Sequence, residues 1–299
     1  MSVKTIALIG FGEVGQALAE DLRRTSCFDL RVFDILNAEE SSKPSHAAKA
    51  MGLTHSSSAA EAARGAEVII SAVTAEQTEA AARASSAGLG DGAFYFDLNS
   101  ASPAAKTGAA HEINAAGGRY VEASVMSPIF PARIASPILL GGPHAKEFEA
   151  IARDIGFSGA RFYSELPGKT AAAKLCRSVM IKGIEALLTE SLLSARYYGV
   201  EDMVLASLDN LVPQPDWPDK ARYMISRAIE HGTRRAEEMR EAAKTVSEAG
   251  LDPLMSAATA ARQDWASGFK PALDEASLHA MLDAVRLQMS QQENSGRKG

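Results

Sequence analysis

Lys174 is a charged residue in an otherwise apolar helical segment. It lies near the start of GKTAAAKLCRSVMIKGIEALL, residues 168–188. A lysine can exchange a proton with a substrate hydroxyl group if its surroundings lower its pKa from the ordinary value of about 10.4. Alternatively, its ammonium group could extend into solvent, as helical lysines usually do. Ser178 shares a helix face with Lys174 and could bind substrate or orient the ammonium group.

Glycines follow the first apolar run in the spacing G-x-G-x-x-G, within IALIGFGEVGQAL. Such a turn between a strand and a helix binds the pyrophosphate of a dinucleotide, with the helix N-terminus facing the phosphates. A flexible turn without a ligand is the alternative, but the strand before and the helix after favour binding. The residues expected to hold the cofactor here are Gly10, Phe11, Gly12, Glu13, Val14 and Gly15.

Asp34 ends the next apolar run, nineteen positions beyond Gly15. A carboxylate at this place accepts hydrogen bonds from the adenosine ribose and repels a 2′-phosphate. The following residues, Ile35 to Asn37, offer no arginine to hold that phosphate. NAD is therefore favoured over NADP, and a simple turn residue is the alternative role for Asp34.

Two further strand ends face the same expected site, because ligands bind at the carboxyl ends of strands in open α/β sheets. Ala72, Val73 and Thr74 follow one apolar run, and their size could let the nicotinamide ribose lie close. Asn99 and Ser100 follow the next run and could bind the nicotinamide amide or the substrate. Ordinary turn chemistry before a helix is the alternative.

These residues require a scaffold of alternating strands and helices. Apolar runs separated by alanine-rich amphipathic segments predict a doubly wound parallel sheet, that is, an α/β Rossmann domain over residues 1–165. From 166 to 290 the apolar spacing is helical and predicts an all-α domain, with one helix of about thirty residues near its start. Residues 291–299 are expected to form a disordered tail. The seven expected strands are 5–10, 30–34, 67–73, 93–98, 119–123, 137–142 and 160–164.

Composition excludes several classes of partner. The chain has 299 residues, 46% hydrophobic and 23% charged, with a net charge of −6. This charge gives no basic surface for nucleic acid or an anionic membrane. No apolar stretch approaches a membrane span. Cys27 and Cys176 are too far apart in sequence to form a C-x-x-C pair, which favours the cytoplasm, and no cluster of ligands predicts a metal site.

The motifs together resemble those of the β-hydroxyacid dehydrogenase family, which includes 3-hydroxyisobutyrate and 6-phosphogluconate dehydrogenases. GFGEVG matches the family's cofactor turn, and DLNSASP its Asp-x-Ser-Thr-x-x-Pro segment. YVEASVMSP resembles its substrate loop, and GKTAAAKLCRS its Gly-x5-Lys-x3-Asn helix. The resemblance implies an NAD(P)-dependent dehydrogenase with Lys174 as general acid/base, and a homodimer formed through the helical domain.

Two departures indicate a divergent branch with an unusual substrate. Ser178 stands where the family has asparagine, and Met126-Ser127-Pro128 stands for Ser-Gly-Gly. The bulky loop could cover an apolar or aromatic part of a small-molecule substrate through Phe130, with Ser127 or Arg133 at a polar end. Equally, it could cover the helical domain or a partner subunit.

His231, Arg234 and Arg235 share a helix face in EHGTRRAEEMR. This face could bind an anionic group of the substrate or form a solvated face paired with Glu230, Glu237 and Glu238. Two other functions remain open for the whole chain. One is an imine reductase of the same fold, and the other is a non-catalytic dinucleotide sensor that needs no lysine in its cleft.

Overall fold

The chain folds into two compact units, Met1–Leu175 and Cys176–Gly299. The structure, a computed structural model, describes residues 3–39, 41–53, 55–208 and 216–296. The division lies ten residues beyond the boundary expected at residue 165. The reason is that the first turn of helix α7 (Lys169–Tyr198) is hydrogen-bonded to the sheet of the first unit through Glu122.

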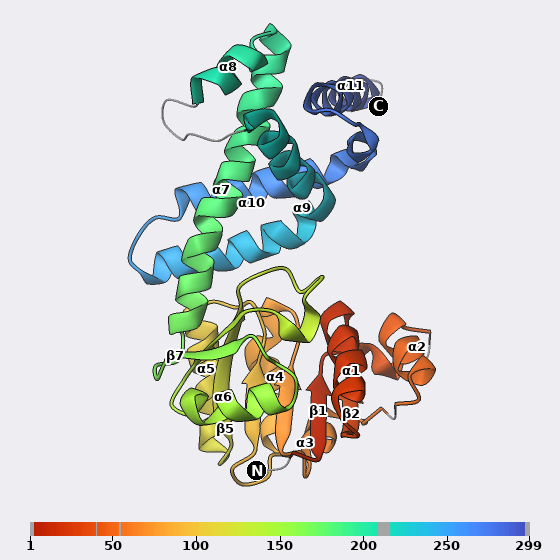
Figure 1. Ribbon diagram of the computed structural model, residues 1–299, viewed down its shortest axis with the longest axis vertical. Coiled ribbons are helices and arrows are strands. Elements are labelled where there is room, and N and C mark those ends of the chain that lie inside the picture. The colour runs from red at the N-terminus through yellow and green to blue at the C-terminus, as the bar shows by residue number, and fades with distance from the viewer. Residues whose placement is uncertain (1–2, 40, 54, 209–215, 297–299) are drawn as a thin grey trace. The chain divides into compact units, whose positions relative to one another are not determined.

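The first unit is built on a seven-stranded sheet in the order β2-β1-β3-β4-β5-β6-β7 (Figure 1). The strand order reverses at β1, which pairs with both β2 and β3, so the carboxyl ends of these strands form a topological switch point. The α/β prediction is confirmed, and all seven expected runs form strands. The strands are β1 (Thr5–Ile9), β2 (Asp29–Phe33), β3 (Val68–Ser71), β4 (Phe94–Asp97), β5 (Arg119–Val125), β6 (Ile138–Gly141) and β7 (Ala160–Ser164).

One strand pair departs from the all-parallel sheet that the sequence predicts. Strand β6 runs antiparallel to β5, with Val125 opposite Ile138, whereas the other pairs are parallel. The connection between β5 and β6 is a loop with one short 3-10 helix, η3 (Arg133–Ala135), in place of the long helical crossover that a parallel pair requires. The chain therefore re-enters the sheet in the opposite direction.

Helices cover both faces of the sheet, because successive strand residues point to opposite sides. Leu8 belongs to a core cluster that includes residues of α1, α2 and α6, whereas Ile9 belongs to a second cluster that includes residues of α3, α4 and α5. Helix α2, which Ser42 caps at its N-terminus, was not expected, because residues 43–50 show only a weak amphipathic pattern. The elements are α1 (Glu13–Thr25), η1 (Ile35–Ala38), α2 (Lys43–Ala50), α3 (Ala59–Ala63), η2 (Ala75–Gln77), α4 (Thr78–Ser86), α5 (Pro103–Ala115) and α6 (Ala145–Asp154).

The second unit is helical in the part that the structure describes. Helix α7 has 30 residues, as predicted, and α9 and α10 form an antiparallel pair joined by a short turn (Figure 1). Its core includes Leu192, Ile225, Phe269 and Leu282. The remaining elements are α8 (Glu201–Leu208), α9 (Trp217–Glu248), α10 (Leu254–Ala266), η4 (Ser267–Asp274) and α11 (Leu278–Gly296).

The sequence predicts a disordered tail over residues 291–299. Helix α11 continues to Gly296, because nothing in QQENS breaks a helix before that glycine; residues 297–299 lie outside the described part. Among the described residues, no helix combines the length and apolar character that crossing a bilayer requires.

Candidate functional site

The glycine turn has the geometry that a bound pyrophosphate requires. Gly10 has φ +92°, and a Cβ atom there would lie 2.4 Å from the carbonyl oxygen of Ala72. A Cβ on Gly15 would lie 2.2 Å from the carbonyl oxygen of Gly10, so only glycine lets α1 start so close to β1. By contrast, a Cβ on Gly12 would meet nothing within 4 Å. The open space lies beside Gly12, at the N-terminus of α1, where a phosphate would bind.

Helix α1 begins without a side-chain cap, since Gly12 is its N-cap residue. The first N–H groups of a helix have no partner within the helix, so they are available to an anion. Phe11 acts through its backbone, because its side chain is buried in the core. Glu13 is exposed and Val14 half-buried at the start of α1. The residues therefore fit a dinucleotide cofactor.

Asp34 links the glycine turn to the end of β2. Its carboxylate accepts hydrogen bonds from the N–H of Phe11 at 2.7 Å and from the N–H of Leu36 at 2.9 Å. The two bonds use different carboxylate oxygens, and each oxygen keeps a second lone pair for a ribose hydroxyl. Asp34 thus fixes the glycine turn, and its carboxylate keeps accepting capacity that a ribose hydroxyl could use.

Asn99 is buried and joins two strand ends. Its side-chain oxygen accepts from the N–H of Val73 at 2.7 Å, and its amide nitrogen donates to Ser71 Oγ at 3.0 Å. These bonds hold the segment after β3, where Ala72 and Val73 are half-buried and Thr74 is exposed. Asn99 therefore joins the segment after β3 to the segment after β4, with its side-chain oxygen and nitrogen both hydrogen-bonded within the protein.

Lys174 and Ser100 lie together, although 74 residues separate them in sequence. Lys174 Nζ donates a hydrogen bond to Ser100 Oγ at 2.6 Å. Ser100 follows β4, at the sheet edge where Gly10, Asp34 and Ala72 follow their strands. The half-buried lysine therefore lies at the carboxyl edge of the sheet and is not one of the solvated lysines of the surface.

Glu122 fixes the start of the helix that carries Lys174. This carboxylate is fully buried on β5 and accepts from the N–H of Gly168 and the N–H of Ala171, both at 2.7 Å. Ser124 on the same strand is hydrogen-bonded to Thr170 at 2.9 Å. A carboxylate at a helix N-terminus also interacts favourably with the helix dipole. Lys174 follows Ala171 by one turn, so these bonds determine where its side chain begins.

A buried ion pair supports the segment that carries Asn99 and Ser100. Lys106 Nζ lies 2.8 Å from an Asp97 carboxylate oxygen and donates to the Asp97 carbonyl at 3.0 Å. Tyr120 donates to the other carboxylate oxygen at 2.7 Å. Burial, followed by the charge of Asp97, raises the pKa of Tyr120 well above its usual value, so it remains a donor. The network fixes the end of β4 just before Ser100.

The loop between β5 and β6 is tied to the cofactor helix. Arg133 donates to Asp21 at 3.0 Å, to Glu20 at 2.7 Å and to the carbonyl of Ala17 at 2.7 Å. The structure thus corrects the expectation that Arg133 meets a substrate carboxylate, because its guanidinium is engaged by α1. Its φ is +51°, an uncommon conformation for a residue with a side chain.

Ser127 and Phe130 lie on that loop. Ser127 Oγ donates to the carbonyl of Pro128 at 3.0 Å. The ring of Phe130 is 44% exposed, with the Arg133 guanidinium 5.8 Å from its centroid. Both side chains keep some accessible surface, so both alternatives for this loop, a substrate contact and a protein contact, stay open.

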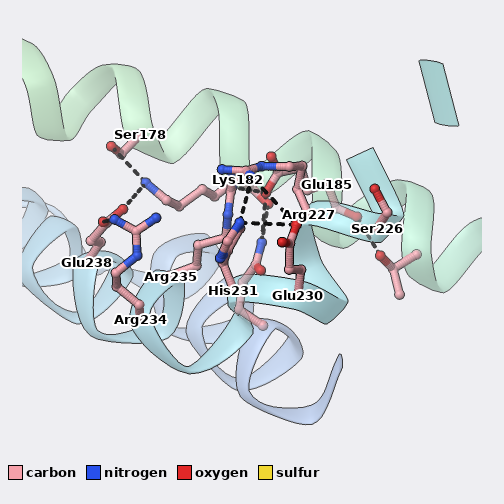
Figure 2. Close-up of polar contacts among 12 residues, drawn as sticks. Ser178, Lys182, Glu185, Ser226, Arg227, Glu230, His231, Arg234, Arg235 and Glu238 are labelled. Carbon is pink, nitrogen blue, oxygen red and sulfur yellow. Dashed lines mark hydrogen bonds and ion pairs between the residues drawn. The ribbon is translucent and has the colours of Figure 1, made fainter. Parts of the chain in front are cut away.

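Ser178 lies in the second unit, one turn after Lys174 on α7. Its Oγ accepts a hydrogen bond from Lys182 Nζ at 3.2 Å, and Lys182 also forms an ion pair with Glu238 at 2.7 Å (Figure 2). Arg234 lies 3.6 Å from the same Glu238 carboxylate. A polar cluster therefore joins α7 to α9, and Lys182 lies at its centre.

His231 is half-buried on α9, on the helix face that also carries Arg234 and Arg235. Its Nε2 is 2.6 Å from Arg227 and 3.1 Å from Glu230, while Arg235 forms an ion pair with the buried Glu185 of α7 (Figure 2). Burial, followed by the charge of Arg227, lowers the pKa of His231 below its ordinary value. The expected pairs with Glu230 and Glu238 form, and Arg234 is exposed, so part of this face is solvated; Arg235 is instead bonded to Glu185 of α7.

One group of possible metal ligands was not found in the sequence. Glu201, Asp202 and His279 have ligand atoms within 4.8 Å of one another. Arg196 forms ion pairs with both Glu201 and Asp283, so the carboxylates already have a cationic partner. We describe this group as an ion-pair network that joins α7, α8 and α11.

Sequence reasoning did not single out Glu122, Lys106 or Lys182. Each is a charged residue that stands among apolar or small residues in sequence, in YVEASV, PAAKTGA and VMIKGI, and this is the signal that could have identified them. Their partners, however, are 46, 9 and 56 residues away in sequence. Only the fold shows which charge each one meets.

Two family models match the chain. One, described as the NAD binding domain of 6-phosphogluconate dehydrogenase, matches residues 5–160. The other, described as a domain of unknown function, DUF1932, matches residues 195–266. No curated protein sequence matches the chain. The first model covers the glycine turn, Asp34 and strands β1 to β6.

Several solved structures are similar to the chain along most of its length. A conserved hypothetical protein from Sinorhizobium meliloti is 34% identical, with a TM-score of 0.78, and the match covers 95% of this chain and 96% of that one. A conserved protein of unknown function, described as structurally similar to 3-hydroxyacid dehydrogenases, is 28% identical, with a TM-score of 0.71 and coverage of 88% and 97%. Mycobacterium tuberculosis 3-hydroxyisobutyrate dehydrogenase with L-serine is 17% identical, with a TM-score of 0.71 and coverage of 95% and 100%, which shows a shared fold.

Proposed function

Because the chain belongs to the β-hydroxyacid dehydrogenase family, we propose that it is an NAD(P)-dependent oxidoreductase that interconverts a hydroxy compound and a keto compound. The observation that carries the proposal is the hydrogen bond from Lys174 Nζ to Ser100 Oγ at 2.6 Å. Through this hydrogen bond a lysine lies at the carboxyl edge of the sheet, where the glycine turn and Asp34 also lie.

When bound, the nicotinamide cofactor supplies the hydride acceptor or donor. Lys174 is the general acid/base: as a neutral amine it takes the hydroxyl proton of an alcohol, and as an ammonium it returns a proton to a carbonyl oxygen. Ser100 orients Lys174 by accepting its hydrogen bond, and Glu122 fixes the helix from which Lys174 projects. The glycine turn and Asp34 hold the pyrophosphate and the adenosine ribose.

The experiment that tests the activity is a panel of hydroxyacids and ketoacids, with NADH and NADPH absorbance as the readout. Turnover of at least one alcohol–ketone pair supports the proposal. Turnover of cyclic imines alone would favour the imine reductase, although Lys174 argues against it. Dinucleotide binding without turnover of any compound would favour a non-catalytic sensor and contradict the proposal.

For the cofactor, NAD is favoured over NADP. The support is the Asp34 carboxylate, which follows β2 and is hydrogen-bonded to the glycine turn; a carboxylate at this place accepts from the adenosine ribose and repels a 2′-phosphate. NADH should bind more tightly than NADPH in fluorescence titrations, and Asp34→Ala should narrow the difference. Tighter binding of NADPH by the unsubstituted protein would refute this assignment.

For the substrate, we favour a compound with a sizeable apolar group over 3-hydroxyisobutyrate and 6-phosphogluconate. The support is the exposed ring of Phe130, on a loop that Arg133 holds against α1, with Ser127 nearby as a polar group. Phe130→Ala should raise KM for the better substrate. Efficient oxidation of 6-phosphogluconate with phenyl-bearing hydroxyacids inert would contradict this choice.

A homodimer formed through the helical unit completes the proposal. Among the described residues, eleven of the sixteen exposed large apolar side chains belong to that unit, including Tyr197, Tyr198 and Met203. Such an excess is typical of a surface that another protein covers. Light scattering should give twice the chain mass of 31.6 kDa, and a monomer at micromolar concentration would contradict this part.

A further inference from the structure

We propose that Lys106 is a positioning residue: its buried ammonium group fixes the turn at Asn99 and Ser100, and through that turn it sets both cofactor affinity and turnover. The turnover part rests on the proposed function, whereas the affinity part requires only a dinucleotide site. Lys106 is fully buried and contacts no ligand itself, so it acts through Asp97.

The ion pair between Lys106 and Asp97 is removed from solvent. Both side chains are 0% exposed, and Lys106 Nζ lies 2.8 Å from Asp97 Oδ1 and 3.0 Å from the Asp97 carbonyl oxygen. Removing two charges from water is costly, and an apolar pair of similar volume often gives the same stability or more. The pair is therefore better explained by what it holds in place than by the stability it adds.

Asp97 is the residue through which the ammonium group acts. Its Oδ1 also accepts a hydrogen bond from the N–H of Asn99 at 2.9 Å, and its Oδ2 accepts from the hydroxyl of Tyr120 at 2.7 Å. The bond to Asn99 closes a turn directly after β4, because an aspartate side chain here binds the backbone two residues further on. Lys106 thus holds the carboxylate that shapes this turn.

One branch of the network leads from Asn99 to the expected cofactor site. The Asn99 side chain accepts from the N–H of Val73 at 2.7 Å and donates to Ser71 Oγ at 3.0 Å, so it holds the segment after β3. This segment packs closely against the glycine turn, since a Cβ atom on Gly10 would lie 2.4 Å from the carbonyl oxygen of Ala72. A displacement of Asn99 should therefore reach the turn that fits a pyrophosphate.

A second branch leads from the next residue to Lys174. Ser100 follows Asn99 and accepts the hydrogen bond from Lys174 Nζ at 2.6 Å. A displacement of about 1 Å would break such a bond. Because both branches begin at one turn, loss of the Lys106–Asp97 pair should weaken cofactor binding and turnover together. A residue with a structural role alone would lower stability and leave both unchanged in the folded protein.

The test begins with Lys106→Met and a rescue variant. In Lys106→Met the Asp97 carboxylate stays buried without a cation, which displaces the turn. The Kd of NADH should rise roughly tenfold in fluorescence titrations, about the loss of one hydrogen bond, and kcat should fall by a similar factor. Adding Asp97→Asn should return both values to within about threefold of the unsubstituted protein, because the buried charge is gone and the amide oxygen still accepts from Asn99.

Ile155→Ala is the matched control. Ile155 is a buried core residue of the same unit, directly after α6, and takes no part in the hydrogen bonds of the network. Its truncation lowers stability by leaving a cavity. The thermal midpoints of all variants are measured first, and Kd and kcat are then compared at a temperature at which each variant is folded. Both values should be unchanged in Ile155→Ala.

The outcomes are distinct. Unchanged Kd and kcat in Lys106→Met, or equal changes in Ile155→Ala, would assign Lys106 to stability alone and overturn the proposal. A change in only one of the two values would overturn the claim that one turn governs both. A double variant no better than Lys106→Met would show that Lys106 does not act through Asp97, which also overturns it.

A second variant covers the case in which Lys106→Met does not fold. Tyr120→Phe removes one donor to Asp97 and leaves the ion pair in place, so Kd should rise and kcat should fall by roughly threefold each. No change in either value would contradict the proposal. Failure of the proposed function looks different, because the unsubstituted protein would then turn over no compound of the panel, while the changes in Kd would remain.

Discussion

Replacing Glu122 with glutamine should destabilise the start of helix α7. The carboxylate accepts two backbone N–H groups at 2.7 Å and is fully buried, so glutamine leaves one N–H facing another donor. A buried unsatisfied donor costs about 1–3 kcal/mol, and loss of the charge at the helix N-terminus adds up to about 2 kcal/mol. We therefore expect the free energy of unfolding to fall by about 2–4 kcal/mol. For a unit of this size, the thermal midpoint should fall by roughly 5–12 °C.

The assay is thermal and urea unfolding followed by circular dichroism. Glu147→Gln is the matched control, since Glu147 is an exposed carboxylate in a single ion pair with Arg119 and should contribute at most about 1 kcal/mol. Equal midpoints for Glu122→Gln and Glu147→Gln would refute the view that Glu122 anchors the helix of Lys174.

Two other predictions concern the loop after β5 and the helical unit. Arg133→Ala should release residues 126–136 from α1, because the side chain of Arg133 makes three hydrogen bonds to that helix. Backbone hydrogen exchange of these residues should become at least about tenfold faster. Unchanged exchange would show that other contacts hold the loop. His231 has a lowered pKa in the folded state, so its contribution to stability is complete above about pH 6.5 and is lost as the pH falls below that value. His231→Gln should therefore reduce the loss of stability between pH 7.5 and 5.5 in urea unfolding, and an unchanged loss would assign it to other groups.

The fold was largely predictable because its signals are local. Apolar runs that end at Gly10 or Asp34 identify strands and their carboxyl ends. The thirty-residue helix α7 is predicted by the helical spacing of its apolar residues alone. The antiparallel direction of β6 was not predicted, because an apolar run does not show in which direction its strand runs. Helix α2 was missed because its proline and polar residues hide a weak apolar pattern.

The part of the candidate site that a sequence motif defines, the glycine turn, was predictable. The spacing of glycines identified the cofactor turn, and the structure adds that Asp34 fixes it through Phe11. The partners of Lys174 and Lys182 could not be predicted, because hydrogen bonds across 74 and 56 residues depend on the tertiary fold. For the same reason Arg133, a plausible substrate ligand in sequence, proved to be engaged by α1.

The most direct test of the central claim is the turnover of Lys174→Met with the best substrate of the panel, measured beside dinucleotide affinity. Lys174 donates a hydrogen bond to Ser100 at the carboxyl edge of the sheet, where the residues expected to hold the cofactor also lie. Lys174 itself is not expected to contact the cofactor. We predict that kcat falls roughly 10²–10⁴-fold, the contribution of a general acid/base, while NADH binds as before. Near-normal turnover by Lys174→Met would contradict the assignment of Lys174 as the proton-transfer group.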